Sequence, residues 1–541
     1  MNVRRSLACA ALSLLFLLLP FEPRVGAPAV GGTQVTLLEA GAVAATAVLL
    51  WAGRSQLASF SARPPLPLVF LGAYAAAHVL SAVFAPEHVG MAAKFSLRMV
   101  SAALFATAVA SAPPRVHRCA LFALVASAAA VACLALGEGL RLTALDTFLD
   151  LFRERVFSVA ADRRATGGVG GPNEAAAFLA AGLVAGAGLL APGWRLILPV
   201  SALISIGLLF TYSRSGLVAA VVGLALLGWA RQGAARRGAI AAAGVLAVLA
   251  GGFVLHPAFR DRLGTELAAQ GYDATYAPAD TRLQLNPGER RTLAVELVNT
   301  GRREWTPAVR PTLHALVHEW PPRQPAGVWR LRLTDTVPPG GTVHTAVTIE
   351  APVRTGTYLL VWDLFTLPSG FLSTSGVPPA LVPFGVGVPP PERVSVPELA
   401  WRRGRLALWR LALLMWRDRP VTGVGSDNFR RLHPRYGGWL TPGNYPMTAH
   451  NQFLEAAANT GTIGLLALIG TLAFSLRAAL AGLRGCDAAL AGVLIGLLGA
   501  FATQALVDSL LEFTGSYLLF GFVVGAVTAL GNDNGRRIGD F

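Results

Sequence analysis

The side chains best suited to chemistry in this sequence stand where a long polar region ends and an apolar segment begins. The stretch His450-Asn451-Gln-Phe-Leu-Glu455 places an imidazole, an amide and a carboxylate in the first turns of that segment. A neutral imidazole at a helix start could take a proton from a hydroxyl nucleophile. Because a single histidine is more often structural, that alternative stays open for His450. Glu455 is expected to brace the helix or a loop, with Asn451 as a second supporting residue.

An arginine at the start of another apolar segment could bind phosphate. Arg214 lies in the short joint Tyr212-Ser213-Arg214-Ser215-Gly216 between two apolar runs. Its planar guanidinium can bind two oxygens at once and keeps its charge. Backbone N–H groups and the dipole at a helix start add to anion binding. The alternative is that the side chain only reaches for the membrane surface.

Two turns next to these segments carry further candidates. Gly170-Gly-Pro172-Asn173-Glu174 predicts a helix-capping turn, in which Asn173 could line a cavity. The lead-in Pro420-Val-Thr-Gly-Val-Gly-Ser-Asp-Asn428 predicts a tight turn and not a phosphate loop, because no Lys-Ser/Thr pair follows its glycines. Arg435, in the basic stretch after this lead-in, is a candidate second phosphate ligand.

The composition describes the elements that must hold these residues. Hydrophobic residues make up 54% of the chain and charged residues 14%, against about a quarter charged in soluble domains. This predicts a polytopic α-helical membrane protein. The net charge of +15 comes from arginines, many of them in short loops between apolar runs. That pattern indicates membrane topology rather than nucleic-acid binding.

The cysteines argue against a metal centre or a disulfide framework. The chain has four, and none lies in the long polar region. No CxxC pair is therefore available there. We expect neither a metal nor a cofactor.

Apolar runs long enough to cross a bilayer predict about twelve transmembrane helices. We place them at about 6–20, 34–52, 66–84, 91–111, 117–137, 173–191, 194–212, 213–230, 237–255, 450–472, 486–506 and 514–531. The first run is short and could instead be a cleavable signal peptide.

The arginines of alternate loops set the expected orientation. They include Arg4, Arg54, Arg115, Arg231 and Arg484, and the positive-inside rule makes their side cytoplasmic. Both termini are then cytoplasmic, while residues 138–172, the Arg214 joint and residues 256–449 face the periplasm. An arginine-rich outer surface favours an anionic partner.

The sequence thus predicts three regions: transmembrane helices 1–9 in residues 1–255, a periplasmic region 256–449, and transmembrane helices 10–12 with a cytoplasmic tail in residues 450–541. Within the periplasmic region, alternating apolar and polar residues at about 278–390 predict a small immunoglobulin-like β-sandwich. We expect it to be a spacer or docking domain. Residues 397–417 predict an amphipathic helix, which either lies on the outer leaflet or packs on the spans.

Taken together, Tyr212-Ser-Arg214-Ser-Gly216, the Pro420–Asn428 lead-in, His450-Asn451-Gln-Phe-Leu-Glu455, Gly461 and Gly464 resemble the O-antigen ligase/polymerase family of bacterial membrane glycosyltransferases. Gly171-Pro-Asn173 resembles that family's turn before the sixth span. The resemblance covers roughly residues 35–530 apart from the β insert. It implies a GT-C-like fold in the inner membrane and an undecaprenyl-diphosphate-linked glycan donor. Transfer would occur on the periplasmic face without a metal or a nucleotide sugar.

The resemblance also assigns roles to residues. Arg214 matches the family's diphosphate-binding arginine, and His450 matches the histidine proposed to activate the acceptor hydroxyl. Arg435 is our choice for the second phosphate arginine, with Arg430 and Arg431 as alternatives. Two arginines and one histidine, without an acid–nucleophile carboxylate pair, favour a single inverting displacement.

Several alternatives remain open from the sequence. The acceptor could be the lipid A core, as in a ligase, another glycan, as in an O-antigen or exopolysaccharide polymerase, or a protein, as in an O-oligosaccharyltransferase. The β insert departs from the family's mostly helical outer loop, so the acceptor is not fixed. A polysaccharide or lipid transporter would show mid-span charges and internal repeats, and few such charges occur here. A structural or sensory protein would leave Arg214 and His450 unexplained.

Overall fold

The computed structural model describes residues 2–23, 29–30, 33–62, 64–153, 156–159, 162–190, 194–254, 271–317, 325–366, 370–373, 377–392, 405–437, 447–485 and 487–538. The chain forms two compact units. The helical unit comprises Met1–Leu263, Trp416–Asn428 and His450–Phe541. The insert unit comprises Gly264–Met415 and Phe429–Ala449.

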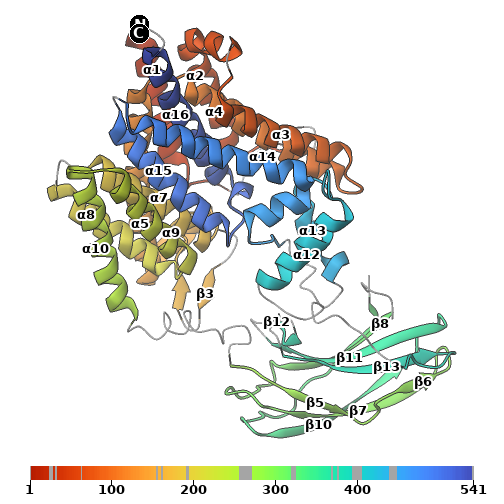
Figure 1. Ribbon diagram of the computed structural model, residues 1–541. Helices are drawn as coiled ribbons and strands as arrows, with labels where there is room; N and C mark the ends of the chain where they lie inside the picture. Colours follow the sequence, from red (N-terminus) through yellow and green to blue (C-terminus); the bar gives the residue numbers. More distant parts are fainter. Residues whose placement is uncertain are drawn as a thin grey trace. The chain divides into compact units, whose positions relative to one another are not determined.

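The helical unit is a bundle of long apolar helices (Figure 1). They are α1 (Asn2–Leu18), α2 (Leu37–Ala62), α3 (Leu66–Val83), α4 (Val89–Ala110), α5 (Pro114–Gly139), α7 (Pro172–Leu189), α8 (Trp194–Phe210), α9 (Arg214–Ala230), α10 (Ala234–Val254), α14 (Gln452–Gly482), α15 (Ala488–Ala505) and α16 (Thr514–Ile538). Shorter elements connect them: η1 (Thr143–Leu145), α6 (Asp146–Leu149), η4 (Leu510–Glu512) and the two-stranded pairs β1 (Ala29–Val30) with β2 (Thr33–Gln34) and β3 (Phe157–Val159) with β4 (Asp162–Arg164).

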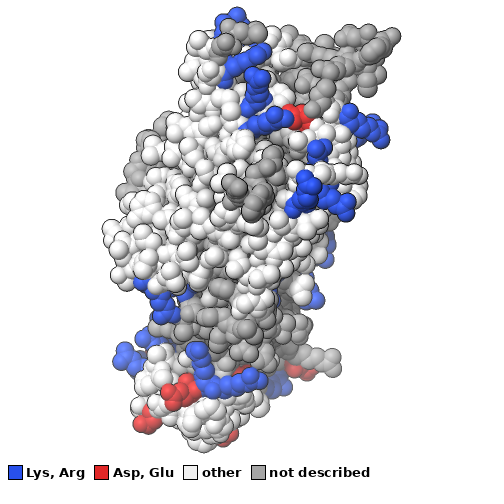
Figure 2. Space-filling view, turned by 90° about the vertical axis from the view of Figure 1, so that its left-hand side faces the viewer, with Lys and Arg blue, Asp and Glu red and all other residues white. Residues whose placement is uncertain are grey.

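Eight of the described helices are long and apolar enough to cross a membrane: α2, α3, α4, α5, α10, α14, α15 and α16. Many large apolar side chains on the bundle are exposed, among them Val221, Trp229 and Val248. Figure 2 shows a wide area with few charged residues on one face of the bundle. Such a surface requires lipid around it. The chain is therefore a polytopic helical membrane protein.

Small residues let two central helices approach closely. A Cβ placed on Gly223 of α9 would lie 3.0 Å from the carbonyl oxygen of Gly496 on α15, and one on Gly496 would lie 2.8 Å from the Gly223 carbonyl oxygen. Gly223 also faces Ala500, whereas Gly492 faces Arg231. The helices are consequently antiparallel, and the start of α9 lies at the end of α15.

The described residues of the insert unit form two sheets. One has the order β10 (Thr342–Glu350), β7 (Arg290–Val298), β5 (Thr275–Pro278). The other has the order β6 (Leu283–Leu285), β13 (Ala380–Val386), β11 (Gly356–Thr366), β8 (Arg310–Val317), β9 (Pro325–Arg330), with β12 (Gly370–Phe371) also paired to β11. Only β6 and β13 pair in parallel among these described strands. Figure 1 shows the sheets as two layers.

Side chains from both sheets meet in one core. Leu297 of β7 and Trp362 of β11 are both buried there, together with Trp305 from the loop after β7. The alternation of buried and exposed residues along β7 follows from the period of two in a strand. Between the sheets and His450, the described residues form the helices α12 (Arg405–Asp418) and α13 (Phe429–Gly437). The N-terminal part of the helix predicted at 397–417 lies outside the described residues.

Candidate active site

His450 stands immediately before α14, in a turn that the next residue stabilises. Asn451 is the N-cap of α14: its side-chain oxygen accepts hydrogen bonds from the N–H groups of Phe453 and Leu454, each at 3.0 Å. Its amide nitrogen donates to the carbonyl oxygen of Leu506 at 2.9 Å. His450 itself has a φ of 48°, an uncommon backbone conformation for a residue with a side chain. The hydrogen bonds of Asn451 thus hold the backbone next to His450, from which the imidazole projects.

The imidazole of His450 is paired with a carboxylate. Its Nδ1 lies 3.1 Å from Oδ1 of Asp508, and the side chains are 34% and 7% exposed. The N–H of Ser509 also donates to this Oδ1, at 3.1 Å. When Nδ1–H donates to the carboxylate, the neutral ring carries its lone pair on Nε2. That is the arrangement of a general base with an orienting carboxylate.

Asp508 was not identified from the sequence. It follows α15, 58 residues after His450, and no periodicity or motif connects the two. The available signal was a carboxylate in the short joint between the last two apolar runs, 486–506 and 514–531.

The first turns of α14 are fastened to the same joint. Glu455, 3% exposed, accepts hydrogen bonds from Asn459 Nδ2 at 3.2 Å and Ser509 Oγ at 3.1 Å. Gln452 Oε1 accepts the N–H of Leu511 at 2.8 Å. These contacts are what a bracing role for Glu455 requires, because they join α14 to the segment that carries Asp508.

A break in α14 lets the lead-in pack against it. Gly461 has φ 67° and ψ −164°, which no helix allows. The N–H of Thr462 therefore donates to the carbonyl oxygen of Pro420 at 2.7 Å, and the carbonyl oxygen of Ala458 accepts the N–H of Val424 at 2.9 Å. The lead-in thus replaces a hydrogen bond that the helix would otherwise make within itself.

The glycines of this contact are needed for close approach. A Cβ on Gly461 would lie 2.2 Å from the carbonyl oxygen of Val421, and one on Gly423, whose φ is 70°, would lie 2.3 Å from the carbonyl carbon of Asn459. Both glycines also hold positive φ values that residues with side chains rarely adopt. The contact positions the helix that begins beside His450.

Arg214 is the first residue of α9. Ser213 caps this helix, with its Oγ accepting the N–H of Gly216 at 3.3 Å, and Tyr212 before it is buried with a φ of 51°. The Arg214 side chain is exposed. Because α9 and α15 are antiparallel, Arg214 lies at the end of the bundle where α15 finishes and Asp508 follows. Arg214 and His450 therefore belong to the same end of the helical unit.

Asn173 links two further elements at this end. It is the second residue of α7, and its carbonyl oxygen accepts a hydrogen bond from Gln504 Nε2 of α15 at 2.9 Å. Its side-chain oxygen accepts a hydrogen bond from Arg164 Nη2 at 2.9 Å, and Arg164 Nε donates to the carbonyl oxygen of Thr211 at 3.0 Å. Arg164 was not identified from the sequence. It connects α7 with the turn that precedes Arg214.

An apolar cavity of about 50 Å³ lies beside this polar end, between α7, α9, α15 and α16. Its walls include Ala181, Ala219, Phe501 and Val523, and Gln504 contributes a polar group. Gln504 is 1% exposed, and its Oε1 has no hydrogen-bond partner among the described residues. The cavity therefore combines an apolar wall with one buried acceptor.

Arg435 lies in α13, in the insert unit, and its side chain lies outside the described part of the structure. Arg430 and Arg431 open the same helix. The choice of Arg435 as second phosphate ligand remains a prediction.

Within the described residues, no group of three or more His, Cys, Asp or Glu side chains is placed to hold a metal ion. The pair of His450 and Asp508 is not extended to such a group in that part of the chain.

Comparisons with known proteins point to one family. A family model described as O-antigen ligase matches residues 392–469, which contain the lead-in, His450 and Gly461. No curated protein matches the chain. One solved structure, the Pseudomonas fluorescens alkylpurine DNA glycosylase AlkC bound to DNA containing an abasic site analogue, is 11% identical over 60% of this chain and 99% of that chain. Its TM-score of 0.16 indicates no shared fold. The family match supports the resemblance that the motifs predicted: residues 392–469 are similar to the O-antigen ligase family.

Proposed function

We propose that the protein is an O-antigen ligase-like glycosyltransferase that moves a glycan from undecaprenyl diphosphate to a hydroxyl of the lipid A core. The observation that carries the proposal is the His450–Asp508 pair. It supplies an oriented base at the start of α14, within the segment that matches the family and at the same end of the bundle as Arg214.

Arg214 would bind the diphosphate of the donor. Its guanidinium is exposed at the first position of α9, where the unpaired N–H groups of a helix start also favour anions. Arg435 would be the second cation, as the family resemblance implies. The two charges would stabilise the negative charge that grows on the leaving diphosphate, and electrostatic stabilisation of this kind supplies most of the rate acceleration in many enzymes.

His450 would activate the acceptor. Its Nε2 takes the proton of the acceptor hydroxyl as the oxygen forms a bond to the anomeric carbon. The bond from that carbon to the phosphate oxygen breaks, and its electron pair leaves with undecaprenyl diphosphate. The Asp508 carboxylate stabilises the positive charge that develops on the imidazole.

The stereochemistry follows from the number of available carboxylates. A retaining double displacement needs one carboxylate as nucleophile and a second group as acid and base. Near His450, Asp508 is engaged with the imidazole, and Glu455 with Ser509 and Asn459. A single displacement with inversion therefore fits the site best.

The apolar cavity beside Gln504 would accept part of the polyprenyl chain. Its volume of about 50 Å³ is too small for a whole carrier but suits a short apolar portion. Since it adjoins the α7 start and the α15 end, an isoprenyl unit there would lie close to the diphosphate held by Arg214.

The membrane arrangement belongs to the same proposal. Twelve spans in the bacterial inner membrane, with both termini in the cytoplasm, put the Arg214 and His450 end in the periplasm. Residues 256–449 would then form the large periplasmic region, with its β-sandwich as a spacer or docking domain and its basic segments facing anionic glycolipids.

A deletion strain tests the proposal and separates the members of the family. Loss of long-chain lipopolysaccharide, with polymer accumulating on the polyprenyl carrier, supports a ligase. Lipopolysaccharide capped by single repeats indicates a polymerase, and unglycosylated protein with normal lipopolysaccharide indicates a protein O-glycosyltransferase. An unchanged envelope would contradict the proposed function.

Complementation should depend on the site. In the deletion strain, His450→Ala should not restore the wild-type lipopolysaccharide, although the variant protein should insert into the membrane normally. The matched control is His344→Ala in β10, because the His344 side chain is 77% exposed and lies in the insert unit. It should restore the phenotype fully.

A further inference from the structure

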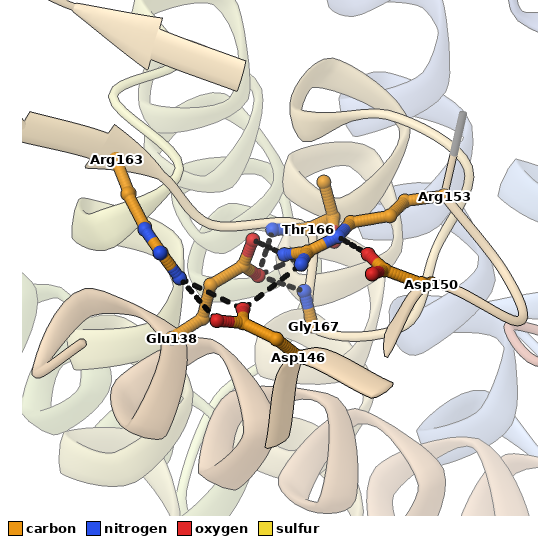
Figure 3. Close-up of polar contacts among 7 residues, drawn as sticks. All are labelled: Glu138, Asp146, Asp150, Arg153, Arg163, Thr166 and Gly167. Atoms are coloured by element: carbon orange, nitrogen blue, oxygen red, sulfur yellow. Dashed lines mark hydrogen bonds and ion pairs between the residues drawn. The ribbon is translucent and has the colours of Figure 1, made fainter. Parts of the chain in front are cut away.

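A network of charged residues lies in the connection between α5 and α7 (Figure 3). Arg153 is 3% exposed, and its guanidinium donates to Glu138 and Asp150 at 2.7 Å each and to Asp146 at 2.9 Å. The hydrogen bond from Arg153 holds the pKa of the Asp146 carboxyl below its usual value. Asp146 therefore stays ionised and also pairs with Arg163 at 2.8 Å. The connection is held by charges that satisfy one another.

The buried carboxylate of Glu138 fixes the chain that follows β4. Its Oε2 accepts the N–H of Thr166 at 2.7 Å and the N–H of Gly167 at 3.1 Å. The N–H of Ala165 donates to the carbonyl oxygen of Phe210 at 2.9 Å, at the end of α8. The residues directly after Arg164 are thus held both at the end of α5 and at the end of α8.

Arg163 and Arg164 are neighbours on β4, so their side chains leave opposite faces of the strand. Arg163 turns to Asp146, as Figure 3 shows. Arg164 turns to Thr211 and Asn173. The network therefore fixes one face of the hairpin and directs Arg164 to the turn before α9.

We propose that Arg164 is a positioning residue of the transfer site, which sets the place of Arg214 relative to His450. This inference rests on the proposed function. Thr211, whose carbonyl oxygen accepts from Arg164, stands three residues before Arg214. Asn173, the second acceptor, is bonded to Gln504 on the helix that precedes Asp508. Through Thr211 and Asn173, Arg164 thus connects the turn before Arg214, which would bind the diphosphate, with α15, which precedes Asp508.

The geometry requires an arginine. Nε and Nη2 of one planar group donate to two acceptors from different elements. A lysine offers a single compact charge without this fork. Arg164→Lys should therefore keep the charge and lose the bridge.

The test uses purified full-length protein with Arg164→Gln, Arg164→Lys and the control Arg290→Gln, an exposed arginine of β7. Equilibrium binding of undecaprenyl diphosphate is measured, alone and in an Arg214→Gln background. We expect both Arg164 variants to weaken binding about tenfold, because both lose the pair of hydrogen bonds to Thr211 and Asn173 that holds the turn before Arg214. The control should bind like wild type. In the Arg214→Gln background, the Arg164 substitution should add no further loss.

Hydrogen exchange provides a readout that does not need the ligand. Amides of residues 211–217 should exchange faster in Arg164→Gln than in wild type or Arg290→Gln, because the turn is no longer held. Amide exchange at the wild-type rate in residues 211–217 of Arg164→Gln would overturn the inference. A tenfold loss of undecaprenyl diphosphate binding that the Arg164 substitution still causes in the Arg214→Gln background would also overturn it. If wild-type protein fails to bind undecaprenyl diphosphate, the proposed function fails, and the exchange rates still decide the role of Arg164.

Discussion

Replacing Asp508 by asparagine removes the charge beside His450 and keeps the size of the side chain. At the observed separation of 3.1 Å, two unit charges attract by about 5 kcal/mol at an effective dielectric constant near 20. The imidazole is about one-third exposed, so water screens part of this attraction. We expect a loss of roughly 2–3 kcal/mol when the imidazole takes the proton, which lowers kcat roughly 30- to 150-fold.

The assay follows glycan transfer with saturating donor and acceptor. KM for the donor should stay near the wild-type value, since Asp508 acts through His450 and not on the diphosphate. The matched control is Asp487→Asn, because Asp487 immediately precedes the opposite end of α15 and pairs with Arg118. It should leave kcat unchanged.

A double substitution tests whether the two residues act as one unit. His450→Ala should abolish transfer, and His450→Ala with Asp508→Asn should be no worse than His450→Ala alone. A wild-type rate in Asp508→Asn would refute the reasoning. So would a further loss in the double variant.

Three more outcomes test the fold and its energetics. Burial raises the pKa of Asp363 in β11 from 3.8 to about 7, so the folded state keeps a proton that the unfolded chain releases. The free energy of unfolding of the insert unit should therefore fall by about 1.4 kcal/mol per pH unit between pH 4 and pH 7. Asp363→Asn should remove this slope when unfolding is followed by tryptophan fluorescence. A stability that rises with pH over this range would contradict the prediction. Gly461→Ala should lower the amount of folded protein in the membrane, by detergent-extracted yield, because its Cβ would meet a carbonyl oxygen at 2.2 Å; a wild-type yield would argue against the break in α14. The sulfurs of Cys9 in α1 and Cys119 in α5 lie 2.7 Å apart. A mild oxidant such as copper phenanthroline should therefore protect two of the four thiols from maleimide, and Cys9→Ser should prevent this protection. Four reactive thiols after oxidation would contradict the packing of α1 on α5.

Local sequence patterns were sufficient for the class of fold and for the helix starts at two candidate residues. Long apolar runs require helices in a membrane, since every backbone polar group must be satisfied there. His450 and Arg214 stand where such runs begin, and the structure has helices starting there. Alternation of apolar and polar residues pointed to strands in the polar region, and strands occur from Thr275 to Val386.

Contacts between distant segments could not be predicted in this way. The break at Gly461 depends on the lead-in, which supplies the replacement hydrogen bond, whereas the sequence pattern predicts one continuous apolar span for α14. Asp508 and Arg164 are defined by partners from distant segments of the chain, His450 before α14 and Thr211 after α8. A single sequence contains no periodicity that joins such positions.

The loop between α5 and α7 shows the same limit. The positive-inside rule expects few arginines in this outer loop, yet the loop has several. From the sequence alone, such arginines favour an anionic partner outside the protein. In the structure, Arg153 and Arg163 pair with carboxylates of the same connection and with Glu138. Charge counting alone could not distinguish arginines that bind a ligand from arginines that hold a loop.

The most direct test of the central claim is transfer by purified protein from a glycan linked to undecaprenyl diphosphate onto a hydroxyl acceptor. Release of undecaprenyl diphosphate and the anomeric configuration of the product would be measured together. We expect an inverted product from wild type and from His344→Ala, and none from His450→Ala. Turnover by His450→Ala at the wild-type rate, or a product with retained configuration, would contradict the proposed mechanism.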